Sequence, residues 1–573
     1  MKEIKILISD NKYTSWEFHD HETNNLLDTD QLPILKTINP STDKMFSRDV
    51  FTIEGDQIKL VKSYVKSASS MAGVLMLEGN KTFGRTENKK RLLYKCIPDD
   101  KYVPPFLIPY EVKVGFSKVQ KNKYVVFRFD SWTDKHPRGL LTETLGDVDN
   151  LEVFYEYQLY CKSLHVSLTD FTNKTRQELN KKTTEEYVDQ ILKNSDFNIE
   201  DRRDRHAFTI DPRTSTDYDD GYGIEQLDNG EYRISIYIAN VYLWLETLSL
   251  WESFSKRVAT IYLPDRRRPM LPTILSDTLC SLQENQPRFA FVMDFVLGIE
   301  GARDIQYKNV LINVHRNYYY EEPELLSDPH YNLLLSASRM MNESIVDSHD
   351  VIAHWMVFMN TQTADLLHSR SKGVFRSVNY INPVVNHIQG IDEDTVRVIQ
   401  TWNNTIGQYI AYDGDAQMGH DFMKTKSYIH ITSPIRRLVD LLNQIILFGN
   451  EKMVVHISDG ADKFLKKWLS ELDYLNTSMR SIRKVQTDCA LLDRCFNSPD
   501  VLEKEYSGVV FDKMIRDNFI LSYMVYLKEL KMLSRINVIT DVDNFTTCKF
   551  KLYLFENEEK TRKKIRLQLL EQQ

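Results

Sequence analysis

The sequence predicts an α+β multidomain protein. Its 573 residues are 42% apolar and 27% charged, which is typical of folded, water-soluble chains. A single hydrophobic core rarely grows beyond ~250 to 300 residues, so this length predicts three or four domains. Strand-like and helical patterns also occupy separate stretches of the chain, which favours an α+β arrangement.

The first half of the chain contains two strand-like regions joined by a helical one. Residues 1–66 have mixed charge and little periodicity, and we assign them no function. Residues 67–170 contain short apolar runs broken by Gly, Asn, Asp and Pro, which predict a small β-barrel. Residues 174–204 have the apolar spacing of helices. From 206 to about 320, predicted strands alternate with irregular segments.

The second half of the chain is predicted to be mainly helical and to return to strands at its end. Between about 331 and 497 the apolar residues recur at helical spacing, with Ile352, Trp355, Met356 and Met359 on one face of a helix ending at Asn360. Such a stripe predicts a core-facing helix. Residues 498–573 are strand-like and close in a basic, helix-like tail that begins at residue 560.

Cysteine usage and hydropathy predict a cytosolic protein without a membrane segment. The six cysteines include no CxxC pair, which favours buried or incidental thiols over a zinc site or disulfide framework. No apolar run reaches 18 residues, and the N-terminus has no signal-peptide core. The net charge is −8, so any nucleic acid must bind through local basic patches.

The most informative segment is HAFTIDPRTSTDYDDGYG at 206–223. Four carboxylates fall within ten residues, directly after a predicted strand: Asp211, Asp217, Asp219 and Asp220. Carboxylates this close repel one another and raise one another's pKa unless a cation neutralises them. Oxygen ligands in this number suit Mg²⁺ or Mn²⁺.

The acidic segment has two other interpretations. An EF-hand loop starting at Asp217 would need Gly at its sixth position and Glu at its twelfth, where this chain has Tyr222 and Asp228, so that interpretation fails. A surface turn rich in Asp is the stronger interpretation on composition alone. The cluster therefore needs support from other motifs.

A second motif, RVATIYLPDRRRPMLPTILSDTLCSL at 257–282, combines an aromatic residue with neighbouring basic residues. Tyr262 beside Arg266 suits the stacking of a base and the binding of a phosphate. A ring buried in the core is the alternative interpretation of Tyr262.

A third motif, YIHITSPIRRLVDLL at 428–442, predicts a helix start. Thr432 or Ser433 would cap the helix, and Pro434 fits its first turn. The helix N-terminus together with Arg436 would then bind an anion. The alternative role of Arg436 is an ion pair with Asp440 four residues later.

Together these motifs resemble the ribonuclease II (RNB) family, and they occur in the family's order between about 200 and 450. The run NYYYEE around Tyr320 also matches. The resemblance implies an RNB catalytic domain at 171–497, with a mixed sheet surrounded by helices. It also implies flanking OB-fold barrels, one of cold-shock type at 67–170 and a degenerate one with a basic tail at 498–573.

The resemblance further implies a hydrolytic 3′–5′ exoribonuclease that degrades single-stranded RNA to nucleoside 5′-monophosphates. Its metal would be Mg²⁺, with Mn²⁺ as an alternative. By motif position, Asp211, Asp217, Asp219 and Asp220 would hold the metal, Arg436 would stabilise charge on the reacting phosphate and Tyr320 would orient the terminal nucleotide. RNA-binding roles fall on Tyr262, Arg266, Ser433 and Arg437. A monomer is expected, with a protein partner as an alternative.

The chain also departs from the family pattern near the position of the RNA end. Ala353 and His354 occur where the family has a glutamate, and the segment between Tyr320 and this helix is shortened, which would delete a second stacking aromatic. His354 could bind a ribose or phosphate, although a hydrogen-bonded core histidine is the more common role for a lone His on an apolar helix. These departures motivate a second hypothesis, a catalytically weak or inactive RNA-binding scaffold.

Overall fold

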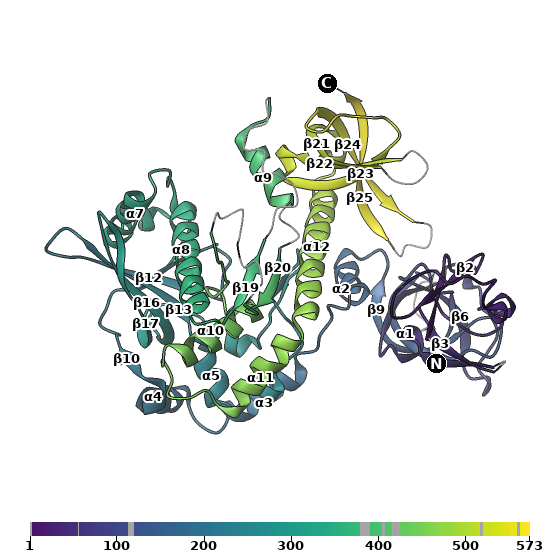
Figure 1. The fold of residues 1–573 in the computed structure, drawn as a ribbon, viewed down its shortest axis with the longest axis horizontal. Helices are drawn as coiled ribbons and strands as arrows, with labels where there is room; N and C mark the ends of the chain where they lie inside the picture. The colour runs from purple at the N-terminus through teal and green to yellow at the C-terminus, as the bar shows by residue number, and fades with distance from the viewer. Residues whose placement is uncertain are drawn as a thin grey trace. The chain divides into compact units, whose positions relative to one another are not determined.

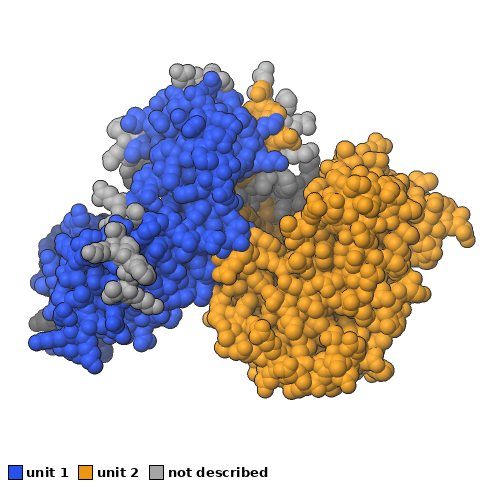
Figure 2. Space-filling view, turned by 180° about the vertical axis from the view of Figure 1, so that it is seen from behind, with its two compact units in different colours: residues 1–165, 263–265, 484–573 blue, residues 166–262, 266–483 orange. Residues whose placement is uncertain are grey.

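The computed structural model describes residues 3–55, 57–112, 120–378, 390–403, 407–414, 419, 425–515, 520–557 and 562–572. The chain forms two units (Figure 2). Unit 1 contains residues 1–165, 263–265 and 484–573, and unit 2 contains residues 166–262 and 266–483. Among the described helices, none combines the length and the apolar composition needed to cross a bilayer. All six cysteines are free thiols, and five of them are buried.

Unit 1 begins with a four-stranded antiparallel sheet. Its strands, in the order β2-β1-β3-β4, are β1 (Ile4–Ile8), β2 (Trp16–Asp20), β3 (Val50–Glu54) and β4 (Gln57–Lys62). Alternate residues of β1 are buried, namely Ile4, Ile6 and Ile8. This two-residue period marks one face packed on a core, a regularity that the sequence prediction for residues 1–66 did not include.

The predicted β-barrel of unit 1 is confirmed. Five strands close in the order β5-β6-β7-β9-β8. They are β5 (Met71–Leu75), β6 (Leu92–Pro98), β7 (Phe106–Tyr110), β8 (Lys123–Ser131) and β9 (Arg138–Asp147). Phe106 and Phe127 pack inside the barrel. Helix α2 (Leu151–Cys161) contacts three barrel strands and stacks Tyr157 on Tyr124.

The end of unit 1 is a five-stranded antiparallel sheet, drawn in yellow in Figure 1. Its strands, in the order β23-β22-β21-β24-β25, are β21 (Glu505–Ile515), β22 (Leu521–Leu527), β23 (Met532–Val538), β24 (Thr547–Glu556) and β25 (Lys563–Gln572). The prediction of a helix-like tail is wrong for 563–572, while residues 560 and 561 lie outside the described residues. Ile565, Leu567 and Leu569 pack on the sheet core at a period of two.

Unit 2 is built on a seven-stranded mixed sheet, as predicted. In the order β10-β17-β16-β13-β12-β11-β18, it comprises β10 (Ile199–Asp201), β17 (Gly301–Asn313), β16 (Pro287–Gly298), β13 (Tyr232–Ala239), β12 (Asp220–Gln226), β11 (Phe208–Asp211) and β18 (Arg316–Tyr319). The pairs β10–β17 and β11–β18 are parallel, and the other pairs are antiparallel.

Unit 2 also contains helices (Figure 1), and the last of them continues into unit 1 from residue 484. They include α3 (Thr169–Leu179), α4 (Thr184–Lys193), α5 (Val241–Thr247), α6 (Pro323–Ser327), α7 (Pro329–Met341), α8 (Ser348–Ser369), α9 (Glu393–Asn403), α10 (Leu438–Asn450), α11 (Asp459–Ser470) and α12 (Leu472–Asn497). Helix α8 buries Ile352, Trp355 and Met359 as predicted, but continues nine residues beyond Asn360. The short strands β19 (Val374–Ser377) and β20 (Gln408–Ala411) interrupt the predicted helical region.

Candidate active site

Antiparallel pairing brings the first and last aspartates of the acidic segment to one edge of the sheet. Strand β11 ends at Asp211, and its neighbour β12 begins at Asp220, with Phe208 opposite Tyr222 in the register. Because the two strands run in opposite directions, the end of one lies beside the start of the other. The parallel strand β18 ends at the same edge, since Asp211 pairs with Tyr319. Tyr320 follows directly.

Backbone hydrogen bonds join the second and third motifs. The amide of Thr260 donates to the carbonyl of Arg436 at 2.9 Å, and Ala259 forms an antiparallel bridge with Arg437. The second motif itself folds as a short hairpin of β14 (Ile261–Tyr262) and β15 (Arg267–Arg268). The segments around residues 260 and 436, far apart in sequence, therefore lie side by side.

Asp219 connects the acidic segment to the third motif. Its carboxylate is buried and accepts hydrogen bonds from the Ile435 amide at 2.9 Å and from Arg436 Nε at 3.0 Å. Burial raises the pKa of Asp219 to about 8, even though the Arg436 charge opposes the shift. A buried carboxylate is not part of a solvated turn, so the surface-turn interpretation of this segment is wrong.

Asp211 and Asp220 supply carboxylate oxygens that are suited to a cation. Asp220 is buried and accepts one hydrogen bond from the Tyr222 hydroxyl at 2.9 Å, whereas Asp211 Oδ2 is buried without a hydrogen-bond partner among the described residues. Burial raises the pKa of both groups, and the charges of Asp220 and Asp219 raise that of Asp211 further. An orphaned, repelled carboxylate oxygen fits a hard divalent cation.

Asp217 is held by an arginine that the sequence prediction did not choose. Arg267 forms an ion pair with it at 2.5 Å and also reaches Asp277. Arg266, the predicted RNA-binding residue, is exposed, and its carbonyl accepts a hydrogen bond from Arg268. Strand alternation could have indicated Arg267 instead of Arg266. Arg267 pairs with Tyr262 across the hairpin, so the two side chains lie on the same face of the hairpin.

Tyr262 lies beside the acidic cluster and is open to solvent. Its side chain is 43% exposed, and its hydroxyl lies 3.5 Å from Asp217 Oδ2. The interpretation of Tyr262 as a core ring is therefore wrong. An exposed aromatic face next to an arginine suits stacking on a nucleic-acid base.

Arg436 is oriented by two neighbours and presents the rest of its guanidinium outward. Besides Asp219, it donates from Nη2 to Ser433 Oγ at 2.9 Å, while 46% of its side chain stays exposed. The alternative pairing of Arg436 with Asp440 is wrong, because Arg437 donates to Asp440 at 2.9 Å. A guanidinium with five donors and two fixed contacts can still bind an anion.

The predicted helix start at Thr432 or Ser433 is also wrong. Helix α10 begins at Leu438 with Arg437 at its N-cap, and the preceding residues form a turn closed by the Arg437 amide and the Ser433 carbonyl at 3.0 Å. The Ser433 amide donates to Asp440 Oδ1 at 2.8 Å. The amides of this turn are thus bonded to the Ser433 carbonyl or to the carboxylates of Asp219 and Asp440.

A histidine ring lies against Tyr320. His349, on the first turn of α8, stacks on Tyr320 with ring centroids 3.7 Å apart and planes 12° apart. Burial and the charges of Asp220 and Asp211 raise the pKa of Tyr320, so its hydroxyl stays protonated. His349 is 29 residues from Tyr320 on another element, and no local pattern indicates this contact.

The two residues that depart from the family pattern lie on α8, one turn after His349. Ala353 is exposed, and the His354 ring packs edge-on against Trp355. His354 Nε2 is buried without a hydrogen-bond partner in the described part of the chain, so the interpretation as a hydrogen-bonded core histidine is wrong. Burial lowers the pKa of His354, which favours the neutral ring.

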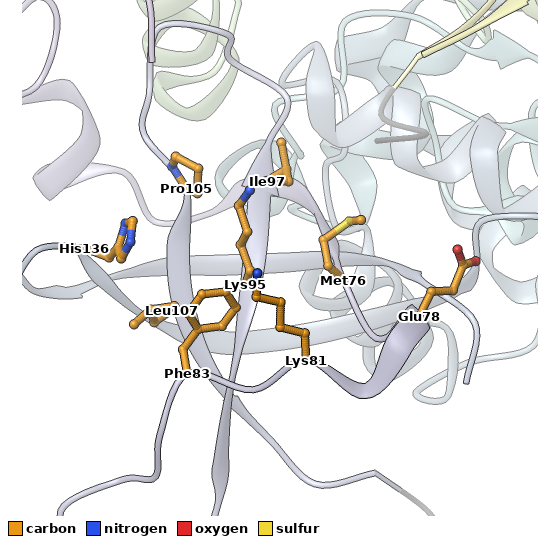
Figure 3. Close-up of a pocket in the computed structure, with 9 residues that line it drawn as sticks. All are labelled: Met76, Glu78, Lys81, Phe83, Lys95, Ile97, Pro105, Leu107 and His136. Carbon is orange, nitrogen blue, oxygen red and sulfur yellow. The ribbon is translucent and has the colours of Figure 1, made fainter. Parts of the chain in front are cut away.

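A separate pocket lies on the barrel of unit 1, and it contains none of the four aspartates. It has a volume of about 350 Å³, and Figure 3 shows its lining, with Lys81, Phe83 and Lys95 together and His136 at one side. The Lys81 ammonium lies 5.6 Å from the Phe83 ring centroid. Rings beside ammonium groups suit a base and a phosphate.

Residues 199–332 match the family model of the RNB domain. This segment is an RNB domain. It contains the four aspartates, Tyr262 and Tyr320, while Arg436 lies outside the matched residues.

Comparisons with individual proteins agree with this assignment. Ribonuclease R of Aquifex aeolicus is 25% identical over 411 residues, which span 58% of this chain and 56% of that protein, so the chain spans about half the length of this curated relative. The structure of Mycoplasma genitalium RNase R in complex with ribose methylated single-stranded RNA aligns with a TM-score of 0.68 at 16% identity, covering 99% of this chain and 100% of that chain.

The same fold occurs in a protein described as inactive. Yeast Ssd1, described as a pseudonuclease, aligns with a TM-score of 0.57 at 14% identity over 96% of this chain and 80% of that chain. The fold shared with these structures therefore does not by itself distinguish a nuclease from a protein that has lost the activity.

Proposed function

We propose that this protein is a divalent-metal-dependent hydrolase that degrades single-stranded RNA from its 3′ end to nucleoside 5′-monophosphates. The observation that carries the proposal is the joining of buried Asp219 to Arg436, which places an exposed guanidinium beside the acidic cluster of an RNB domain. The relationship to ribonuclease R supports RNA as the substrate class.

The acidic cluster is suited to hold the metal. Asp211, Asp217, Asp219 and Asp220 would bind Mg²⁺, or Mn²⁺ as the alternative, which when bound supplies an activated water and neutralises phosphate charge. The raised pKa values of the buried carboxylates mean that protons compete with the cation. We therefore expect tighter metal binding at higher pH.

The side chains around the cluster have distinct tasks. Asp219 and Ser433 hold the Arg436 guanidinium in place, so that its free N–H groups donate to a phosphate oxygen as charge develops there. The protonated hydroxyl of Tyr320 donates toward the terminal nucleotide beside Asp211 and Asp220. Tyr262 stacks on a base further along the strand.

RNA contacts beyond the cluster are proposed at three predicted residues and at the barrel pocket. Arg266 is exposed and reaches a phosphate, whereas Arg437 and Ser433 act by shaping the turn that carries Arg436. Phe83 and Lys81 of the barrel pocket bind RNA within unit 1.

An RNA-binding protein without turnover is the second candidate. Two observations favour it: arginines already neutralise Asp217 and Asp219, and Ala353 lies where the family has a glutamate. In such a protein the arginines would replace the metal, and RNA would bind equally well in EDTA.

The two candidates are separated by the products formed from one RNA labelled at either end. Purified full-length protein is incubated with 5′-labelled or 3′-labelled single-stranded RNA in Mg²⁺ or EDTA. The proposal predicts that the 3′ label is released first as a mononucleotide and that the 5′ label ends in a short limit product, both only with Mg²⁺. Binding of intact RNA in both buffers would establish the second candidate.

A further inference from the structure

Three histidines and an aspartate gather at the end of the RNB-domain sheet opposite to the acidic cluster. His206 lies two residues before β11, and His315 lies directly before β18. Asp328 caps α7, and His330 is in its first turn. At ~3.3 Å per residue, the five residues from His206 to Asp211 span roughly 16 Å, so the two clusters are separate.

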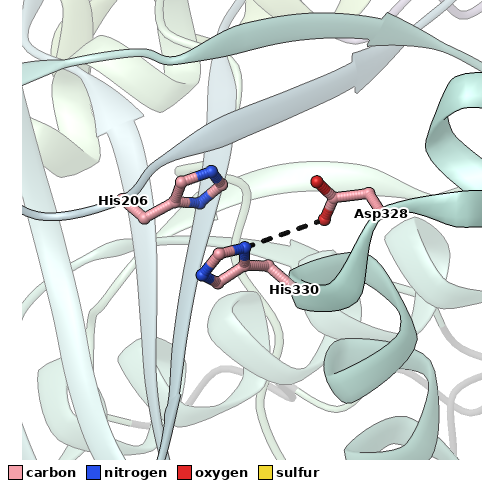
Figure 4. Close-up of side chains that lie close together, drawn as sticks. All are labelled: His206, Asp328 and His330. Atoms are coloured by element: carbon pink, nitrogen blue, oxygen red, sulfur yellow. Dashed lines mark ion pairs between the residues drawn. The ribbon is translucent and has the colours of Figure 1, made fainter.

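Three side chains of this cluster bring possible metal-ligand atoms close together. His206, Asp328 and His330 each offer one ligand atom, and these atoms all lie within 4.8 Å of one another. Figure 4 shows the two rings facing each other, with the Asp328 carboxylate aimed at His330; Nδ1 of that ring is 3.9 Å from Asp328 Oδ1. We propose that His206, Asp328 and His330 form a binding site for Zn²⁺.

The state of His206 supports the proposal. Its Nδ1 is buried and has no hydrogen-bond partner among the residues that the structure describes. Burial and the neighbouring His330 and His315 lower the pKa of His206 to about 4, so the ring is neutral at physiological pH. A neutral imidazole with an unused nitrogen is the form that binds a metal.

The remaining contacts orient the carboxylate ligand. Asp328 Oδ1 accepts from the Tyr331 amide at 2.8 Å, and Oδ2 accepts from the Tyr318 hydroxyl at 3.1 Å. Each carboxylate oxygen has a second lone pair, so these bonds leave both oxygens able to bind an ion. Hydrogen bonds of this kind position metal ligands in proteins.

The present ring arrangement sets a condition on binding. The His206 and His330 centroids are 3.7 Å apart with planes 8° apart. A ring nitrogen offers its lone pair in the ring plane, so one ion cannot lie in the planes of two parallel, stacked rings. We infer that His330, whose side chain is 36% exposed, turns about its Cβ–Cγ bond when Zn²⁺ binds.

The ligand types select the ion. Two imidazoles and one carboxylate match Zn²⁺, which takes nitrogen and oxygen ligands in tetrahedral sites, whereas Mg²⁺ prefers oxygen ligands alone. Water is the expected fourth ligand, because the neighbouring His315 ring is stacked on His206 with centroids 4.4 Å apart and its Nδ1 lies 3.3 Å from the Ala207 amide. The ion would join the start of β11 to α7.

Metal analysis of full-length protein tests this site. Untagged, metal-free protein is dialysed against micromolar Zn²⁺ in excess Mg²⁺, which occupies the acidic cluster, and Co²⁺ then serves as a probe for histidine ligation by its visible absorption. We expect about one Zn²⁺ per chain, and we expect bound Co²⁺ to show the visible absorption of histidine-ligated Co²⁺. His206→Gln and His330→Gln should each weaken Zn²⁺ binding about tenfold or more.

Matched variants keep the result interpretable. Asp328→Asn retains the helix cap, because Asn caps as well as Asp, and should still lose Zn²⁺. His456→Gln, at an exposed position outside the cluster, and Asp219→Asn, in the acidic cluster, should both keep it. Wild-type protein that retains no Zn²⁺, or equal retention by wild type and Asp328→Asn, would overturn the proposal whether or not the protein cleaves RNA.

Discussion

Replacing Arg436 with alanine is expected to slow RNA cleavage and to make the stability of unit 2 more sensitive to pH. The guanidinium donates to Asp219 at 3.0 Å and to Ser433 at 2.9 Å, and its exposed part is proposed to contact phosphate. The substitution therefore removes a phosphate donor and also removes the positive charge beside a buried carboxylate.

The two effects have separate magnitudes. Loss of a preorganised donor costs ~2 to 4 kcal/mol of transition-state stabilisation, which is roughly 30- to 900-fold in rate. For stability, burial already raises the pKa of Asp219 to about 8, and loss of the opposing Arg436 charge raises it further. For each pH unit in which Asp219 is ionised in wild type but protonated in the variant, the difference in free energy of unfolding between the two proteins changes by ~1.4 kcal/mol.

The sign of the pH effect follows from proton binding. An aspartate in the unfolded chain titrates near 3.8, so the folded state holds an extra proton between that pH and its own raised pKa, and stability falls as pH rises through this window. In wild type, the fall in stability caused by Asp219 ends near pH 8. In Arg436→Ala it continues above pH 8, so the stability difference between the proteins should grow from pH 8 to 9.

Two measurements check this prediction. Initial rates of Mg²⁺-dependent cleavage at saturating RNA measure the loss of the phosphate donor. Thermal unfolding in EDTA from pH 6 to pH 9.5 measures the effect of the buried Asp219 charge on stability. Arg303→Ala, at an exposed arginine of β17 that forms a surface ion pair with Glu231, is the control and should leave both readouts near wild type. A rate within about threefold of wild type together with parallel stability profiles would refute the reasoning.

Two further predictions concern the metal and the RNA. Mg²⁺ should raise the unfolding temperature more at pH 8 than at pH 6, because burial raises the pKa of Asp211, Asp219 and Asp220 and the ion must displace their protons; equal shifts at both pH values would contradict this. Tyr262→Ala should weaken binding of single-stranded RNA by ~1 to 3 kcal/mol in a titration, whereas Tyr262→Phe should bind like wild type. Equal losses in both variants would assign the effect to the hydroxyl group and exclude stacking.

Much of the fold and of the candidate site could be predicted because their signals are local. Short apolar runs indicated the barrel. The clustering of Asp219 and Asp220 after a strand indicated a charged site, and in the structure burial raises the pKa of these carboxylates. The position of Tyr262 next to basic residues was also a local signal, whereas its exposure was established only by the structure.

The errors occurred where distant residues supply the hydrogen bonds. The sequence around Ser433 and Pro434 is a good helix start, but Asp219 accepts from Ile435 and Asp440 accepts from Ser433, so the chain forms a turn and α10 begins later. Similarly, the tail pairs with β24 and becomes a strand, although its charged residues suggested a helix.

Two residues were missed for different reasons. Arg267, not Arg266, contacts Asp217, and strand alternation from Tyr262 could have identified it. His349 contacts Tyr320 only because α8 packs near the end of β18, and this tertiary contact has no local sequence signal.

The central claim is that the acidic cluster binds a divalent cation used to hydrolyse RNA, and Asp211→Asn tests it most directly. Asp211 Oδ2 has no hydrogen-bond partner in the described part of the chain, so this substitution removes a ligand and disturbs few contacts. Wild type and variant are compared on 5′-labelled single-stranded RNA in Mg²⁺ and in EDTA, with RNA affinity measured in parallel. The account predicts metal-dependent cleavage by wild type alone and similar RNA affinity for both proteins. Equal cleavage by both, or cleavage by wild type that persists in EDTA, would contradict it.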